Sequence, residues 1–231
     1  RFSDLVWFKE PWMRDSLAKF SSKRKHYFLP NAVEKIDMQE PPYRDRDIFF
    51  IWANRFVDTR YPHWFVDAVK EIEASGISVS SLTMGLLDES NAVERTISLQ
   101  HHVQAIAPDS MKLLSYSDPR PYFDRSRFFV LAADAVFGNN SLYESMHRGV
   151  VPIVTEAPGV ELIIQDGVNG LVAEKSKKGL LNALRRAVKV TDDRWDKMSY
   201  QARRTAAVEL SVERWMSDFD DLVGKCIRKG S

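Results

Sequence analysis

Residues 136–172 constrain the fold of this chain more than any other stretch of the sequence. They contain, in order, a polar loop that ends at Ser141, a helix start, an apolar run at residues 150–155, a turn at Gly159 and a second helix start. An apolar run bounded by turn residues is typical of a strand that is buried on both faces of a parallel sheet. We therefore expect two helix N-termini close together at one edge of a sheet.

The rest of the chain repeats this alternation of strand and helix. Apolar runs predict strands at residues 5–8, 27–29, 48–53, 79–84, 111–114, 128–132, 150–155 and 171–172. Helical spacing and capping residues predict helices at 11–20, 62–75, 91–106, 121–126, 141–148 and 177–190. They also predict a helical turn at 161–165 and a helical end of the chain. The alternation predicts an α/β fold with a right-handed, doubly wound, parallel sheet of the Rossmann type.

Composition excludes several classes of partner. The 231 residues carry a formal net charge of +1, so bulk charge gives no reason to expect nucleic acid or an anionic membrane as partner. A single cysteine, Cys226, favours a reducing compartment and hence the cytoplasm. No apolar run reaches the length of a membrane span, and the chain opens at Arg1 directly before a strand-like run. We therefore expect a fragment of a longer protein.

The two predicted helix starts favour an anionic ligand. Free backbone N–H groups and the helix dipole attract negative charge, and ligands of doubly wound sheets bind at the carboxyl ends of the strands. The segment from Ser141 to Glu144 admits two interpretations. It forms a capping box, or Glu144 accepts hydrogen bonds from a ribose while residues 140–142 offer N–H groups to a phosphate.

Other residues at this edge also have two interpretations. Gly159 and Glu161 either begin a helix or let the backbone approach a ligand closely. Arg55 and Arg60 follow the buried strand at residues 48–53, and are either surface arginines or a fork of donors for phosphate oxygens.

In order and spacing, these segments resemble the C-terminal domain of retaining GT-B glycosyltransferases of the glycosyltransferase family 4 type. Residues 139–172 are similar to that family's paired-glutamate, glycine-turn and Asp-Gly-x-x-Gly-Leu-Val pattern. Residues 29–33 resemble its Pro-Asn-Gly-Val hinge, and residues 54–60 its Arg…Lys segment. Residues 116–122 and 211–215 resemble the loop before the donor-binding strand and the start of the last helix.

The resemblance implies a glycosyltransferase of hexosyltransferase type, acting in polysaccharide or glycoconjugate biosynthesis. It implies that Arg55 and Arg60 neutralise the diphosphate of a nucleotide diphosphate sugar and that Glu144 holds the ribose. The transferred sugar keeps its anomeric configuration, and the arginines and helix N-termini stabilise the departing diphosphate without a metal or other cofactor. The other implied donor-binding residues are Asn140, Ser141, Leu142, Gly159, Glu161, Ser115 and Tyr116.

The chain departs from the family pattern at the first glutamate. Val136 stands eight positions before Glu144, and the nearest carboxylate is Asp134, which a local insertion would bring to the transferred sugar. The missing glutamate favours one alternative, a non-catalytic nucleotide-sugar-binding or scaffold module. A sugar-nucleotide epimerase of the same two-domain architecture is another. Donor hydrolysis or sugar transfer, and epimer formation without an acceptor, would separate these functions.

The resemblance also implies a domain organisation. Residues 1–30 would be the end of an N-terminal domain and the hinge, residues 31–210 the donor-binding domain, and residues 211–231 a helix that packs back on the N-terminal domain. The acceptor, a carbohydrate or a lipid-linked molecule, would bind the mostly absent N-terminal domain. The fragment alone would then bind donor weakly and turn over poorly, because domain closure assembles the site.

Two further expectations concern metals and membranes. His101 and His102 are adjacent, so on a helix they point in different directions and do not chelate together, and we expect no metal site. Trp7, Trp12 and the basic residues 23–25 suggest a peripheral membrane contact with a lipid-linked acceptor, but buried aromatic residues and a solvated loop are the favoured explanation.

Overall fold

The computed structural model of the protein describes residues 6–8, 13, 26–29, 31–34, 46–87, 93–136 and 138–227. The predicted helix at residues 11–20, apart from Met13, lies outside this part of the chain. The side chains of residues 6–8, Trp12 and the basic segment at 23–25 also lie outside it.

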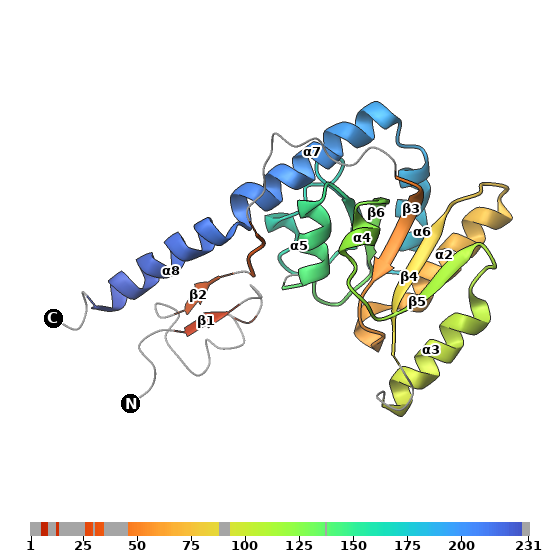
Figure 1. Ribbon diagram of the computed structural model, residues 1–231, viewed down its shortest axis with the longest axis horizontal. Coiled ribbons are helices and arrows are strands. Elements are labelled where there is room, and N and C mark those ends of the chain that lie inside the picture. Colours follow the sequence, from red (N-terminus) through yellow and green to blue (C-terminus); the bar gives the residue numbers. More distant parts are fainter. Residues whose placement is uncertain are drawn as a thin grey trace.

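Six parallel strands form the main sheet, in the order β5-β4-β3-β6-β7-β8 (Figure 1). Their bounds are β3 Ile48–Ala53, β4 Ser81–Leu86, β5 Met111–Ser115, β6 Ser126–Leu131, β7 Val151–Thr155 and β8 Leu171–Ala173. The strand order reverses between β3 and β6, which is the topological switch point of a Rossmann-like sheet. The prediction of a doubly wound parallel sheet is confirmed.

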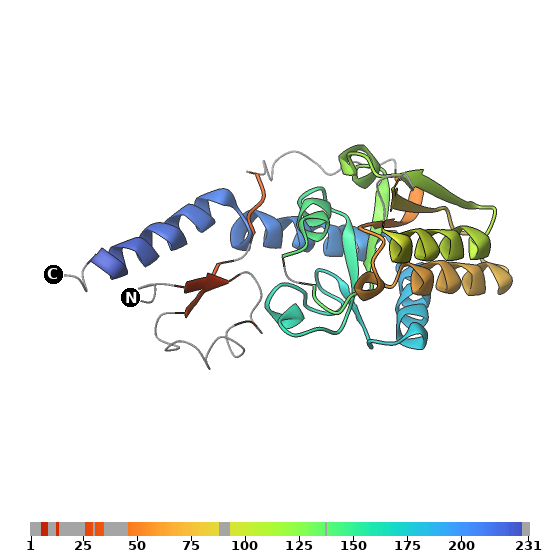
Figure 2. The ribbon, with the colours of Figure 1, turned by 90° about the horizontal axis from the view of Figure 1, so that it is seen from below.

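Helices cover both faces of this sheet (Figure 2). One face packs against α2 Pro62–Ala74, α3 Glu94–Ile106 and α6 Lys177–Val188, and the other against α4 Arg120–Phe123 and α5 Asn140–His147. The helix α7 Asp192–Glu209 reaches both clusters. Strand β3 needs cover on both faces because its side chains alternate between two apolar layers. Phe50 and Trp52 face one layer, and Ile51 and Ala53 face the other. All four side chains are nearly inaccessible to solvent.

Within the described ranges, the predicted elements agree with the observed ones to within a few residues. The predicted helical turn at residues 161–165 is a single 3-10 turn, Val160–Leu162, so the expected second helix start is too short to be a full helix. Ile163 and Ile164, which follow it, are buried in the sheet-facing cluster. So short a turn has almost no dipole, and the expected pair of helix N-termini is reduced to one.

The two ends of the described chain lie to one side of the sheet (Figure 1). There β1 Val6–Phe8 and β2 His26–Phe28 form a separate parallel pair. The helical end consists of α7 and α8 Val212–Ile227, which are separated at Ser211, where Val33 forms a parallel bridge. None of the helices in the described ranges is both long and apolar enough to cross a membrane.

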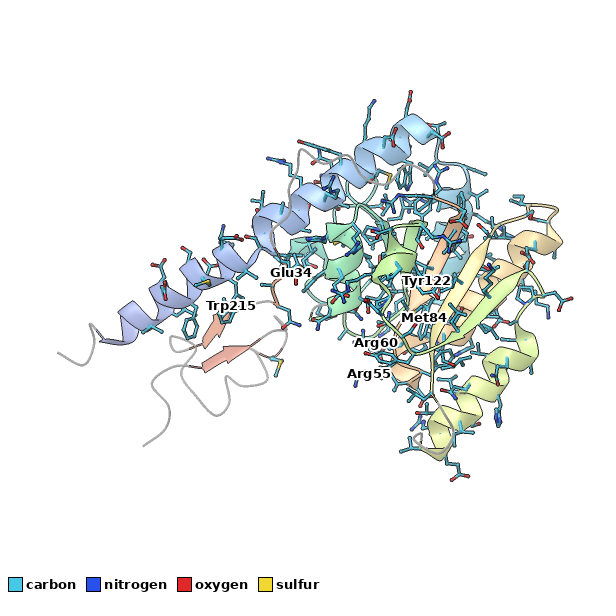
Figure 3. All side chains as sticks on the ribbon, viewed as in Figure 1. Glu34, Arg55, Arg60, Met84, Tyr122 and Trp215 are labelled. Atoms are coloured by element: carbon cyan, nitrogen blue, oxygen red, sulfur yellow. The ribbon has the colours of Figure 1, made fainter. Side chains whose placement is uncertain are left out.

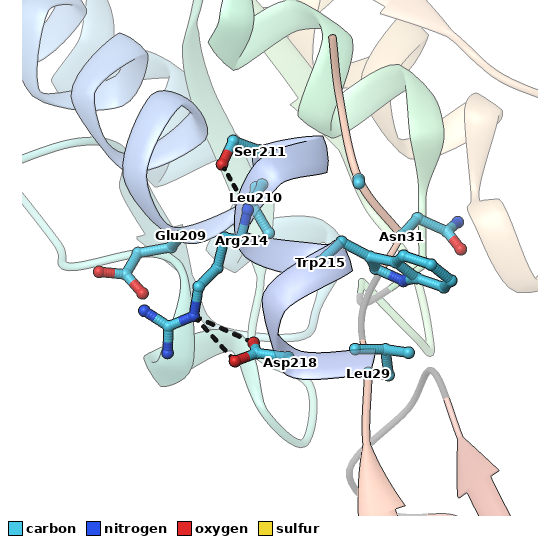
Figure 4. A pocket seen from close by; sticks show the side chains of 9 residues that line it. Leu29, Asn31, Glu209, Leu210, Ser211, Arg214, Trp215 and Asp218 are labelled. Atoms are coloured by element: carbon cyan, nitrogen blue, oxygen red, sulfur yellow. Dashed lines mark hydrogen bonds and ion pairs between the residues drawn. The ribbon is translucent and has the colours of Figure 1, made fainter. Parts of the chain in front are cut away.

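A shallow pocket lies between the segment after β2 and the start of α8 (Figure 4). Leu29, Asn31 and Trp215 line it, and Arg214 bonds Asp218 one turn further along α8. Its volume of about 10 Å³ is enough for about one water molecule, so it is a small gap between packed segments and too small for a ligand.

Candidate functional site

The switch point brings the loops after β3 and β6 together at the carboxyl edge of the sheet. Asn54 and Arg55 directly follow β3, and the 3-10 turn η2 Asp58–Arg60 comes before α2. Figure 3 labels Arg55 and Arg60, both of which come from the segment between β3 and α2. Asp134 follows β6, and its backbone N–H donates to the carbonyl of Thr59 over 3.0 Å, so the two loops are directly joined.

Helix α5 begins at the same edge because two asparagines hold it there. Asn139, which is 6% exposed, donates from Nδ2 to Oδ1 of Asn54 over 2.8 Å. Its own Oδ1 accepts the N–H of Leu142 over 2.9 Å and caps the helix. The N-cap is therefore Asn139, and the capping-box interpretation of Ser141 and Glu144 is wrong. An asparagine satisfies the cap as well as a serine does, and here it also reaches β3.

The first turn of α5 presents fewer free amides than the sequence suggests. The N–H of Leu142 is used by the cap, and the side chain of Leu142 is buried. Asn140 is exposed and Ser141 half-buried, and within the described chain their N–H groups have no acceptor. Asn31, in the segment after β2, holds Asn140 in position. Its Nδ2 donates to Oδ1 of Asn140 over 2.6 Å and to the carbonyl of Gly138 over 3.2 Å.

The two predicted arginines differ in exposure and in the hydrogen bonds that their guanidinium groups make within the chain. Arg55 is exposed, and its guanidinium has no hydrogen-bond or ion-pair partner among the described residues. Arg60 is half-buried, and its Nη1 donates to the carbonyl of Ala135, just after β6. Arg55 therefore offers its whole guanidinium to a ligand, whereas part of the Arg60 group ties η2 to the loop after β6.

Asp134 is the centre of a small polar cluster. Its Oδ1 accepts a hydrogen bond from the Tyr61 hydroxyl over 2.7 Å and contacts Lys175 Nζ at 2.6 Å. The hydrogen bond from Lys175, and then that from Tyr61, lower the pKa of Asp134. In the opposite sense, the hydrogen bond to Asp134 raises the pKa of Tyr61. Val136, at the family's first-glutamate position, is fully buried.

Glu144 is half-buried on α5, and its carboxylate has no hydrogen-bond or ion-pair partner in the described part of the chain. Burial raises the pKa of this carboxyl, while the nearby Arg120 acts in the opposite direction. An unpaired carboxylate that is partly withdrawn from water is costly for the fold, and it remains available to accept hydrogen bonds.

The remaining predicted residues lie along the same edge. Gly159 has φ +88°, a conformation that suits glycine, and is buried before the 3-10 turn that carries the exposed Glu161. Ser115 ends β5 and Tyr116 follows it, 72% exposed, with its N–H bonded to the carbonyl of Leu86 over 2.8 Å.

Three contributors were missed from the sequence: Tyr61, Asn139 and Lys175. The signal for Lys175 was its place two residues after β8, at the carboxyl edge. Tyr61 gave no signal, because a non-glycine residue with φ +41° cannot be read from sequence.

A larger cavity, of about 150 Å³, lies at the opposite, amino edge of the sheet among Ile48, Ser80, Lys112, Tyr122 and Arg125. None of the predicted site residues lines it. Among the described residues, no group of three or more histidine, cysteine, aspartate or glutamate side chains is placed to hold a metal ion.

Comparison with known proteins points to one family. The sequence profile described as glycosyl transferases group 1 matches residues 48–189, which include all six strands of the main sheet. No curated protein sequence matches the chain.

Solved structures match the fold over nearly the whole chain. HepE from Anabaena in complex with UDP-glucose aligns with a TM-score of 0.78 at 14% identity, covering 97% of this chain and 65% of HepE. Sucrose-phosphate synthase from Thermosynechococcus elongatus aligns with a TM-score of 0.79 at 16% identity, covering 99% and 59%. The pneumococcal O-GlcNAc transferase GtfA, in complex with UDP and GlcNAc, has a TM-score of 0.71 at 16% identity, covering 97% and 45%. The chain thus spans less than two thirds of the length of these proteins.

Proposed function

We propose, from the premise that this chain belongs to the glycosyl transferases group 1 family, that it is the donor-binding half of a retaining glycosyltransferase. The observation that carries the proposal is the Asn54–Asn139 hydrogen bond of 2.8 Å. It fixes the start of α5 beside the end of β3, so that a helix N-terminus and Arg55 serve the same edge of the sheet.

The diphosphate of the donor would lie between Arg55, Arg60 and the first turn of α5. The N–H groups of Asn140 and Ser141 point away from the helix, as free N-terminal amides do, and the helix dipole favours an anion there. The exposed Arg55 supplies a guanidinium, and Arg60, which also donates to the carbonyl of Ala135, adds a second positive charge. Charge that builds up on the departing diphosphate would be stabilised by the same groups.

The nucleoside would extend from the diphosphate along the sheet edge. We assign the ribose hydroxyls to Glu144, whose carboxylate has no hydrogen-bond or ion-pair partner among the described residues, and the base to the loop that begins at Ser115 and Tyr116. The close turn at Gly159 and the carboxylate of Glu161 would border the donor on the β7 side. The crystal structure of HepE in complex with UDP-glucose supports a donor of this class.

The reaction would be transfer of a hexosyl group to an acceptor hydroxyl with retention at the anomeric carbon and without a metal. We propose that residues 31–210 bind the donor, and that residues 1–30 and 211–231 belong with an N-terminal domain that holds a carbohydrate or lipid-linked acceptor. The open carboxyl edge suits a site that closes against a second domain, so the chain alone should turn over poorly. Its single cysteine favours the cytoplasm.

A thermal-shift screen with UDP, GDP, ADP and their glucose or mannose forms tests donor binding. A ligand that binds only the folded state raises the melting temperature by mass action, so one nucleotide of the three should shift the transition. Arg55→Ala and Glu144→Ala should abolish that shift. Arg125→Ala, at the opposite edge of the sheet, should leave it unchanged. No shift with any nucleotide would refute the assignment.

The buried Val136 favours a second candidate, a module that binds a nucleotide sugar without transferring it. The two functions differ in one measurement on the full two-domain protein. Release of free nucleotide from the donor, with or without an acceptor, indicates chemistry, whereas a binding module gives saturable binding and no release.

A further inference from the structure

Asp134 is contacted by side chains from two other segments at the carboxyl edge. Tyr61 from the β3–α2 connection and Lys175 from the loop after β8 both contact its Oδ1, while Oδ2 has no partner among the described residues. We propose that Asp134 and Lys175 together bind two adjacent hydroxyls of an uncharged donor sugar. This inference rests on the proposed function and names the class of sugar for the same site.

The first argument is the hydrogen-bonding capacity that the pair leaves unused. Lys175 carries three N–H donors and uses one on Asp134, and Asp134 keeps Oδ2 as an acceptor. A hydroxyl is both donor and acceptor, so one sugar hydroxyl can donate to Oδ2 while its neighbour accepts from Nζ. Both side chains are about 40% exposed, which leaves them reachable by a ligand.

The second argument is that an ordinary surface ion pair does not need such support. An exposed pair contributes little to stability, and its two side chains usually have no third side chain that orients them. Here Tyr61 adopts φ +41°, a strained conformation for a non-glycine residue, and its ring stacks on Trp64 at 4.0 Å. Strained backbone that places a phenol on a carboxylate is typical of a site whose geometry has to be fixed.

The third argument concerns position and charge. Val136 is fully buried and cannot present a side chain to the donor, whereas Asp134 lies near Arg60, which would hold the diphosphate. The sugar follows the diphosphate directly, so it would lie over this cluster. Because the charges of Asp134 and Lys175 cancel, the cluster suits a neutral hexose, and a sugar with its own carboxylate would face Asp134.

The experiment compares the bare nucleotide with its sugar, by calorimetry on the 231-residue chain. The probes are UDP, UDP-glucose and UDP-glucuronate, with GDP and GDP-mannose, and ADP and ADP-glucose, as parallel pairs. Lys175→Met should weaken binding of the nucleotide sugar about tenfold, as expected for losing a hydrogen bond to a charged group, and leave the bare nucleotide unchanged. Asp134→Asn should do the same for UDP-glucose and raise the relative affinity for UDP-glucuronate, because Lys175 is then uncompensated.

Lys177→Met is the matched control. Lys177 lies two residues further along the chain and pairs with Asp67 at 2.9 Å, so this variant also loses one exposed ion pair. It should bind nucleotide and nucleotide sugar like the unaltered chain. An equal loss of both ligands in Lys175→Met would make Lys175 a phosphate contact, and no loss of either would make it a surface residue; both overturn the inference. Failure of the unaltered chain to bind any nucleotide overturns the proposed function, and this inference with it.

Discussion

Asn31 and Asn140 are joined by a hydrogen bond of 2.6 Å across 109 residues of chain. This bond, with that between Asn139 and Asn54, means that two successive residues at the start of α5 are held by two different segments. One segment is the end of β3 and the other is the stretch that enters the domain. These two hydrogen bonds fix the position of the start of α5, so its geometry depends on both segments.

Asn139→Ala should separate capping from site geometry. The variant loses a helix cap, which costs about 1 kcal/mol, and also the link to Asn54. We expect unfolding in urea to show a loss of this size, and nucleotide binding to fall well beyond it. Ser176→Ala removes the equivalent cap of α6, where Ser176 accepts the N–H of Gly179 over 2.9 Å. It should cost similar stability and leave the nucleotide affinity of the folded chain unchanged. Equal effects of the two variants on binding would contradict the role given to Asn139.

Much of this arrangement could be predicted from the sequence, because buried parallel strands read as continuous apolar runs. The run at residues 48–53 and the one before Thr155 both correspond to central strands of the sheet. What could not be predicted is which polar side chains meet across loops. Ser141 fitted a capping pattern in the sequence, but the hydrogen bond from the Leu142 N–H to Asn139 Oδ1 shows that Asn139 is the cap. Lys175 and Asp134 are 41 positions apart in sequence, and no local pattern records such a contact.

Glu144→Gln should stabilise the chain while it abolishes ribose binding. Burial raises the pKa of Glu144, so at neutral pH the folded state carries a carboxylate that it partly withdraws from water. A carboxyl whose folded pKa is raised contributes stability only at low pH, and this contribution is lost as pH rises through the folded pKa. The gain in stability of the glutamine variant over the unaltered chain should therefore grow as pH rises from the unfolded pKa to the folded pKa of Glu144. Above the folded pKa this gain should stay constant. Melting curves between pH 4 and pH 8, with and without nucleotide, measure both effects. A glutamine variant that is less stable at pH 7 would mean that the carboxylate has a partner in the fold.

Asp134 predicts the opposite pH dependence. Its pKa is lowered by Lys175 and Tyr61, so the stability from this cluster is present above the unfolded pKa and is lost as pH falls through the folded pKa. Asp134→Asn should remove that part of the acid sensitivity. The check is the slope of melting temperature against pH on the acid side, compared between the variant and the unaltered chain. Identical slopes would show that Asp134 is not held by its partners in solution.

Arg46 is expected to be a stability residue with no part in binding. Its half-buried guanidinium lies at the amino edge and donates to the carbonyls of Phe123, Ser126 and Arg148, and desolvation lowers its pKa to about 10. Arg46→Met leaves these carbonyls without a donor, and the expected loss is about 3 kcal/mol in urea unfolding. The exposed Arg125, which pairs with Asp47, provides the control, and Arg125→Met should cost less than about 1 kcal/mol. At a temperature where Arg46→Met is still folded, its nucleotide affinity should match that of the unaltered chain.

The last prediction concerns Gly85, because this glycine lets β4 lie directly against the residue that aligns α5. Gly85 has φ +129°, and a Cβ there would lie 1.9 Å from the carbonyl oxygen of Asn54. Gly85→Ala must therefore push Asn54 away or distort β4, and either change breaks the bond to Asn139. We expect a loss of several kcal/mol in stability and, in whatever fraction stays folded, no thermal shift with nucleotide. Gly76→Ala gives the comparison, since Gly76 also has a positive φ, of +86°, but nothing lies within 4 Å of its Cβ position. It should lose only about 1 kcal/mol from backbone strain and retain the full nucleotide shift. Retention of that shift in Gly85→Ala would mean that the position of Asn54 does not control the site.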